Sequence, residues 1–307
     1  MHPALSIIVF TTLTGIGYGL AAVLGLGLLD PAATATKFAH VLALAMISSG
    51  LSSSVLHLGN PQRAWRSLSQ WRSSWLSREG VLALLTFLPL LCSAWASLIE
   101  DRHILLPGVL GALLAAATVY CTAMIYASLK SVQAWNTWLT PVGYLLFSAA
   151  GGLVMSAFFA ACGAGDVFPF ALGAIFFLAA AWTVKFLRRK RMRDAEPLST
   201  PESATGLGDI GRVKLFERPH VTENYLTREM GFVVARKHAG KLTRIAVLAG
   251  GAIPVLLLLT VASGVASGPA VVAATGSAAI LHGLGMLVER WLFFAEARHA
   301  VMNYYGG

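Results

Sequence analysis

The residues best suited to chemistry lie in one polar stretch, Val55–Leu85, which separates two strongly apolar runs. It carries His57 near its start and Glu79 near its end, with four arginines and three tryptophans between them. Ionisable groups at the edge of an apolar layer are costly unless they are partnered, so such a pair is a functional-site hypothesis by default. An imidazole exchanges a proton near neutral pH, and a carboxylate can relay one. The pair therefore suits a reaction that takes up protons at the edge of a hydrocarbon layer.

Reduction of a quinone is a reaction of this kind, because each quinone takes up two electrons and two protons. In this interpretation His57 hydrogen-bonds a quinone carbonyl, and Glu79 brings protons from the aqueous side. Arg63 or Arg78 polarises the ring oxygens or holds the carboxylate. Trp65 holds the ring at the headgroup level, where indole is favoured. The alternative is an ordinary interfacial loop, in which the helix dipole stabilises Glu79 at a helix N-terminus.

The elements that must position these residues are membrane-spanning helices. Of the 307 residues 56% are hydrophobic and 12% are charged, whereas ordinary soluble domains have about 25% charged residues. Runs of about 20 apolar residues, each long enough to cross a bilayer, recur along the chain. We predict eight spans, at about 5–29, 36–56, 81–99, 104–129, 139–162, 168–187, 245–266 and 270–294. The sequence thus predicts an all-α polytopic membrane protein, an eight-helix transmembrane bundle.

One long polar insert interrupts the predicted bundle, at about residues 185–244 between spans six and seven. It is basic at both ends, and its middle has the composition of a linker. A helix is predicted at about 222–238, with Thr222 as its N-cap. We therefore expect a single domain over residues 1–307 that carries this insert on one side of the membrane.

No metal centre is expected in this chain. Cys92, Cys121 and Cys162 are scattered through apolar runs, whereas an iron–sulfur cluster needs about four thiolates. His40 and His282 lie inside the second and eighth spans, where histidines at matching depth could ligate haem b. Because the two are predicted at different depths, haem b is not favoured.

The basic residues are distributed very unevenly between the two sides. Eight spans place both termini on one side, with the loops after spans two, four and six. Of 23 Lys and Arg residues only Lys37 and Arg102 fall on the other side, which leaves 21. The positive-inside rule makes the basic side cytoplasmic, so we expect a multi-pass protein of a bacterial inner membrane with both termini in the cytoplasm. The net charge of +9 then reflects topology and attraction to acidic lipid or an acidic partner, and gives no reason to invoke nucleic acid.

A second set of charges closes the last span, and consists of Glu289, Arg290, Glu296, Arg298 and His299. It could line the same cavity as His57 or form an interfacial set of ion pairs, and we favour the second. Charges inside the spans are otherwise scarce, which argues against a transporter with a polar translocation path.

Several stretches resemble a known family. "LHLGNPQRAWRSL" followed by "SWLSREG", then "IYASLKSVQAWNTWLTPVGY" and "ERWLFFAEARH", are similar to the membrane-anchor subunits of the dimethyl sulfoxide reductase type, the DmsC family. The resemblance spans all eight helices and implies a single membrane-anchor domain. It implies two partners, a molybdopterin catalytic subunit and a four-cluster iron–sulfur subunit, which hold the molybdenum cofactor and the iron–sulfur clusters. It also implies electron exchange with ubiquinone or menaquinone without a haem, with His57 and Glu79 in the family's quinol site.

Two features distinguish this chain from the familiar reductase anchor. That enzyme presents its catalytic subunits to the periplasm, whereas the corresponding side here is basic and is predicted to be cytoplasmic. The insert ending "TREMGFVVARKHAGKL" is absent from the familiar anchor. Together they resemble the anchors of cytoplasm-facing sulfite dehydrogenases (SoeC type), which oxidise sulfite to sulfate and reduce quinone. The alternatives are the anchor of a dimethyl sulfoxide or related reductase that oxidises quinol, a purely structural anchor, and a membrane transporter.

Overall fold

The computed structural model describes residues 4–56, 58–197, 199–214, 216–217 and 234–305. Eight helices in this part are long and apolar enough to cross a membrane, which confirms the predicted all-α fold of eight spans. Six are α1 (Leu5–Gly25), α2 (Thr34–Leu56), α3 (Trp75–Glu100), α4 (Leu105–Ala127), α6 (Val167–Asp194) and α10 (Pro269–Ala295). The fifth is α5 (Leu139–Phe159), continued by a π-helical turn (Ala160–Ala164), and the seventh joins α8 (Val234–Val247), a π-helical turn η4 (Leu248–Ala252) and α9 (Ile253–Ala262).

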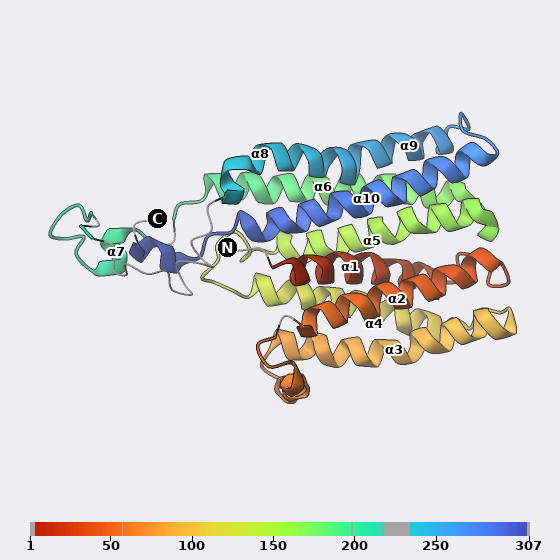
Figure 1. Cartoon of the computed structure of the whole chain (residues 1–307), viewed down its shortest axis with the longest axis horizontal. Coiled ribbons are helices and arrows are strands. Elements are labelled where there is room, and N and C mark those ends of the chain that lie inside the picture. Colours follow the sequence, from red (N-terminus) through yellow and green to blue (C-terminus); the bar gives the residue numbers. More distant parts are fainter. Residues whose placement is uncertain (1–3, 57, 198, 215, 218–233, 306–307) are drawn as a thin grey trace.

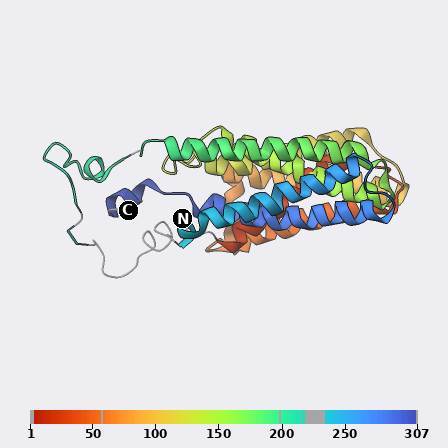
Figure 2. The ribbon, with the colours of Figure 1, turned by 90° about the horizontal axis from the view of Figure 1, so that it is seen from above.

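The spans lie side by side and alternate in direction, so that α1 begins and α10 ends at the same end of the bundle (Figure 1). The short helices η1 (Pro61–Gln70) and α7 (Pro201–Thr205) lie at this end too. Figure 2 shows the segment after α6 extending past the spans there. We call it the basic end, and it holds the loops after spans two, four and six as predicted. The opposite end carries the ion pair between Lys37 and Asp101, whose Nζ and Oδ1 atoms are 2.5 Å apart.

The first span is the centre of the bundle. α1 packs on α2, α4, α5 and α10, and its most apolar window is 72% buried, against 28% for α2. Glycines permit its closest approach to α5. A Cβ atom on Gly19 would collide with the Ser148 carbonyl oxygen, and one on Gly152 would collide with the Gly19 backbone. α1 therefore packs directly against α4, the helix that carries the hydroxyl partner of Glu79, and against α5.

The polar insert begins later than the sequence predicted. α6 has 28 residues, or about 42 Å at roughly 1.5 Å per residue, which exceeds the roughly 30 Å of hydrocarbon. Lys185, which lies where predicted span six and the predicted insert overlap, is buried within this span. Of the helix predicted at about 222–238, residues 222–233 lie outside the described residues, and α8 includes the remainder. The polar connection proper therefore runs from the end of α6 to the start of α8.

Candidate functional site

The loop before α3 is held against the start of that helix. The Ser74 hydroxyl caps the helix by accepting a hydrogen bond from the Ser77 N–H at 3.4 Å. The Ser77 hydroxyl in turn donates to the Ser67 carbonyl of η1. These two contacts tie η1 to the first turn of α3, so Glu79 lies in the second turn of an anchored helix.

Glu79 is buried, with only 5% of its surface exposed. Its Oε1 accepts a hydrogen bond from the Thr122 hydroxyl of α4. One turn earlier in α4, the Thr118 hydroxyl lies 3.2 Å from the Thr86 hydroxyl of α3. Tyr18 of α1 is within electrostatic reach of Glu79 and lies beside Thr118, and its hydroxyl is buried. Glu79 thus ends a row of buried polar groups and makes no ion pair within the described part of the chain.

Arg78, next to Glu79 in sequence, binds the loop instead of the carboxylate. Its Nε donates to the Trp71 carbonyl at 3.0 Å, and its Nη2 donates to the Arg72 carbonyl at 2.7 Å. Its guanidinium carbon lies 4.3 Å from the centre of the Trp75 ring, within cation–π distance. Arg78 therefore stabilises the loop, contrary to the expectation that it could hold the Glu79 carboxylate.

The other predicted site residues are placed unequally. Arg63 and Trp65 are exposed on η1, where the Arg66 guanidinium lies 5.5 Å from the centre of the Trp65 ring. Exposed indoles and arginines suit the lipid headgroup level. His57 lies outside the described residues, so its role with Glu79 stays a prediction.

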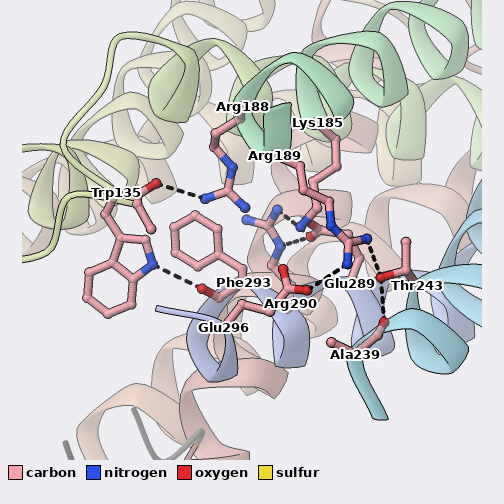
Figure 3. A network of polar contacts seen from close by, with 11 residues as sticks. Trp135, Lys185, Arg188, Arg189, Ala239, Thr243, Glu289, Arg290, Phe293 and Glu296 are labelled. Atoms are coloured by element: carbon pink, nitrogen blue, oxygen red, sulfur yellow. Dashed lines mark hydrogen bonds and ion pairs between the residues drawn. The ribbon is translucent and has the colours of Figure 1, made fainter. Parts of the chain in front are cut away.

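A second cluster of charges lies between α6 and α10 (Figure 3). Lys185 Nζ lies 2.5 Å from Glu289 Oε1, and the Arg290 guanidinium binds the other carboxylate oxygen. All three side chains are buried. Less deeply, Arg189 Nη2 lies 3.1 Å from Glu296 Oε1. The predicted ion pairing at the end of the last span is confirmed for Glu289, Arg290 and Glu296, with two cations supplied by α6.

This cluster holds more positive than negative charge. The Arg188 guanidinium donates to the Ala134 carbonyl at 3.4 Å and lies 4.5 Å from the centre of the Phe293 ring, with no carboxylate partner among the described residues. The Arg290 guanidinium lies 4.3 Å from the centre of the Tyr144 ring. Aromatic faces attract cations but carry no full charge. Within the described part of the chain, the cluster therefore depends on Glu289 for its buried negative charge.

Comparison with known proteins decides the family. A model of the DMSO reductase anchor subunit family (DmsC) matches residues 1–191, which include His57 and Glu79. This chain belongs to the DmsC family. It is also 32% identical to the C subunit of sulfite dehydrogenase from Allochromatium vinosum, over 99% of each chain. The protein is therefore a membrane-anchor subunit of a DMSO reductase-type complex, which implies catalytic and iron–sulfur partner subunits and argues against the transporter interpretation.

His282, inside the last span of this DmsC-family chain, is in contact with the backbone of a neighbouring helix. His282 Nδ1 lies 2.8 Å from the Gly250 carbonyl oxygen, and its buried Nε2 has no partner among the described residues. A Cβ atom on Gly151 would lie 3.3 Å from that Nε2, so His282 lies close to the α5 backbone. His40 is carried by α2, which packs chiefly on α1. The described residues contain no group of three or more His, Cys, Asp or Glu that could hold a metal ion.

Sequence reasoning missed the hydroxyl partner of Glu79 and the α6 cations that pair with the glutamates at the end of the last span. Thr118 and Thr122 are four residues apart on α4, a spacing that places two hydroxyls on one helix face. Lys185 and Arg189 have the same spacing on α6; Lys185 pairs with Glu289 of α10, and Arg189 pairs with Glu296 directly after that helix. Polar residues at helical spacing within an apolar run were the sequence pattern that could have predicted these buried partners. This pattern was overlooked on α6 because Lys185 was assigned to the insert.

Proposed function

We propose that this anchor subunit passes electrons between a partner iron–sulfur subunit and quinone, at a site built around His57 and Glu79. The observation that carries the proposal is the buried Glu79 carboxylate, which has a hydroxyl partner but, among the described residues, no cation partner at the basic end of the bundle. An ionisable group placed in this way within a membrane span is a functional-site hypothesis by default. The match of the family model over this region supports it.

In the proposed mechanism the chain supplies binding and protons, whereas the partner subunits supply electrons from their molybdenum cofactor and iron–sulfur clusters. His57 donates a hydrogen bond to one quinone carbonyl and so favours negative charge on that oxygen. Glu79, oriented by Thr122, gives a proton to the reduced ring and regains one from the basic end. Arg63, Trp65 and Arg78 hold the loop and the ring at the headgroup level.

We further propose that the complex oxidises sulfite and reduces ubiquinone or menaquinone. The supporting observation is the similarity to the C subunit of sulfite dehydrogenase, which covers 99% of this chain and therefore includes the insert. The second candidate is a reductase that oxidises quinol, favoured by the family description alone.

Sulfite-dependent reduction of a soluble quinone analogue by the purified native complex tests this proposal. We expect quinone reduction with sulfite as the donor, and none from the anchor subunit alone, which lacks the catalytic partner. A complex that oxidises quinol with dimethyl sulfoxide and ignores sulfite would select the second candidate. A complex that reacts only with soluble dyes would identify a purely structural anchor.

The basic end is proposed to face the cytoplasm of a bacterial inner membrane, together with both termini and the catalytic partners. The 21 to 2 distribution of Lys and Arg supports this orientation. Alkaline phosphatase fused after Gly307 is expected to be inactive, because the enzyme matures only outside the cytoplasm. The same reporter fused after Asp101, in the loop at the opposite end, is expected to be active. Reversed activities would overturn the orientation and remove the argument for a cytoplasmic sulfite enzyme.

A further inference from the structure

A cavity of about 510 Å³ opens at the basic end, outside the Glu79 site. Its walls come from the end of α6, the segment 131–134, the segment after α6 and the chain that follows α10. This volume lies within the range of about 300–1,000 Å³ that is usual for ligand pockets. Because α6 is longer than the hydrocarbon thickness, the cavity beside its last turns lies toward the aqueous side.

The cavity is lined by more cations than anions. Arg189, Arg193 and Arg298 contribute to its walls, together with the carboxylate of Glu296. Arg189 already binds that carboxylate, at 3.1 Å. Arg193 and Arg298 are exposed and make no ion pair within the described part of the chain. Among the described residues these two guanidinium groups have no carboxylate partner, so each can bind an incoming acidic group.

The buried cluster adds positive charge directly behind this cavity. Arg188 reaches the cavity wall through its hydrogen bond to the Ala134 carbonyl, and Ala134 is itself a lining residue. Arg188 has no carboxylate partner among the described residues, so its charge adds to that of Arg193 and Arg298. Concave sites with an excess of one sign of charge concentrate the field that an approaching partner meets.

We propose that this cavity is the socket that receives an acidic segment of the partner iron–sulfur subunit. The proposal rests on the proposed function, in which that subunit docks at the basic end to reach the Glu79 site. Besides the last turns of α6, the walls come largely from chain segments that follow the spans, which favours a protein occupant over a lipid headgroup. Arg193 and Arg298 bind the carboxylates, and the cavity admits the side chains that carry them. The socket fixes the register of the partner on the anchor, since charge pairs across an interface set orientation and specificity.

The test is the salt stability of the whole complex with charge-reversing variants. Arg193→Glu, Arg298→Glu and the double variant change the socket. Lys190→Glu and Arg191→Glu are matched controls, because these exposed residues lie on the same end of α6 but do not line the cavity. The complex is immobilised through the anchor and washed with rising NaCl, and the released iron–sulfur subunit is measured by its iron. We expect the double variant to release about tenfold more partner than either control at the same NaCl concentration.

Equal release from socket and control variants would show that only the general positive field matters, and would overturn the proposal. Unchanged release from every variant would overturn it as well. Unchanged release with loss of phospholipid phosphorus from the purified protein would make the cavity a lipid site instead. A Glu variant that lowers the melting temperature of the anchor alone is replaced by the neutral variants Arg193→Gln and Arg298→Gln. Complexes with these variants must still release more iron–sulfur subunit than the complex with Lys190→Gln. If the wild-type complex cannot reduce quinone but the variants release the partner as expected, the quinone proposal is refuted and the socket proposal stands.

Discussion

Glu289→Gln is expected to destabilise the folded anchor by about 3–5 kcal/mol, the usual cost of removing one partner from a buried ion pair. The carboxylate binds Lys185 through one oxygen and Arg290 through the other, and all three side chains are buried. An amide keeps the shape of the side chain but removes its charge, so both cations lose their counter-charge inside the bundle. Thermal unfolding of the purified anchor in detergent measures the loss, and a reduced amount of protein in the membrane should accompany it.

Glu296→Gln is the matched control for this change. The Glu296→Gln change breaks the ion pair with Arg189. The pair is more exposed than that of Glu289, since 24% of the Arg189 side chain and 11% of the Glu296 side chain are accessible. We therefore expect a loss of stability of only about 0–1 kcal/mol. Combining Glu289→Gln with Lys185→Met should recover part of the stability, because one unpaired buried cation is removed with its partner. Equal losses for Glu289→Gln and Glu296→Gln, or no recovery in the double variant, would contradict the role of Glu289 as the buried counter-charge of the cluster.

His57→Ala and Glu79→Gln are each expected to slow electron transfer to quinone by about one to two orders of magnitude. The physical reason is the loss of one charge-assisted hydrogen bond or proton donor at the ring, worth roughly 1.5–3 kcal/mol. Oxidation of the substrate by an artificial acceptor at the catalytic subunit should stay intact, since that reaction does not involve the anchor. Both activities are measured on the same purified variant complex. Thr122→Val, which removes only the hydroxyl that orients Glu79, should give a smaller loss in the same direction.

Glu100→Gln is the control for Glu79→Gln, because it makes the same chemical change at the other end of the same helix. Glu100 is exposed and pairs with Arg102, and neither activity should change. If both activities fall together in His57→Ala or Glu79→Gln, these residues hold the complex together rather than serve the quinone. If neither activity falls, quinone binds elsewhere, and the charged end around Glu289 and His299 becomes the next region to test.

Much of the architecture follows from the sequence alone. Apolar runs of about 20 residues can satisfy their backbone in a membrane only as helices, so the number of spans, their order and their alternating direction could be predicted. Because the number of spans is even, the loops after spans two, four and six had to share one end with both helix termini. The position of Glu79 at that end and the confirmed family could be predicted too, since the local motif around it is distinctive.

Side-chain partners were decided by the tertiary structure. Each partner depends on how a helix is rotated about its axis and how deeply it lies, and those quantities are set by packing between helices rather than by local sequence. Arg78 is adjacent to Glu79 in the chain but binds the loop carbonyls, whereas Thr122 reaches the carboxylate from 43 residues away. Lys185 could be assigned to the insert from sequence because hydropathy locates the end of a span only to within a few residues. Its pairing with Glu289, 104 residues away, arises only when α6 and α10 bring their charged faces together, because a buried charge is stable only beside its counter-charge.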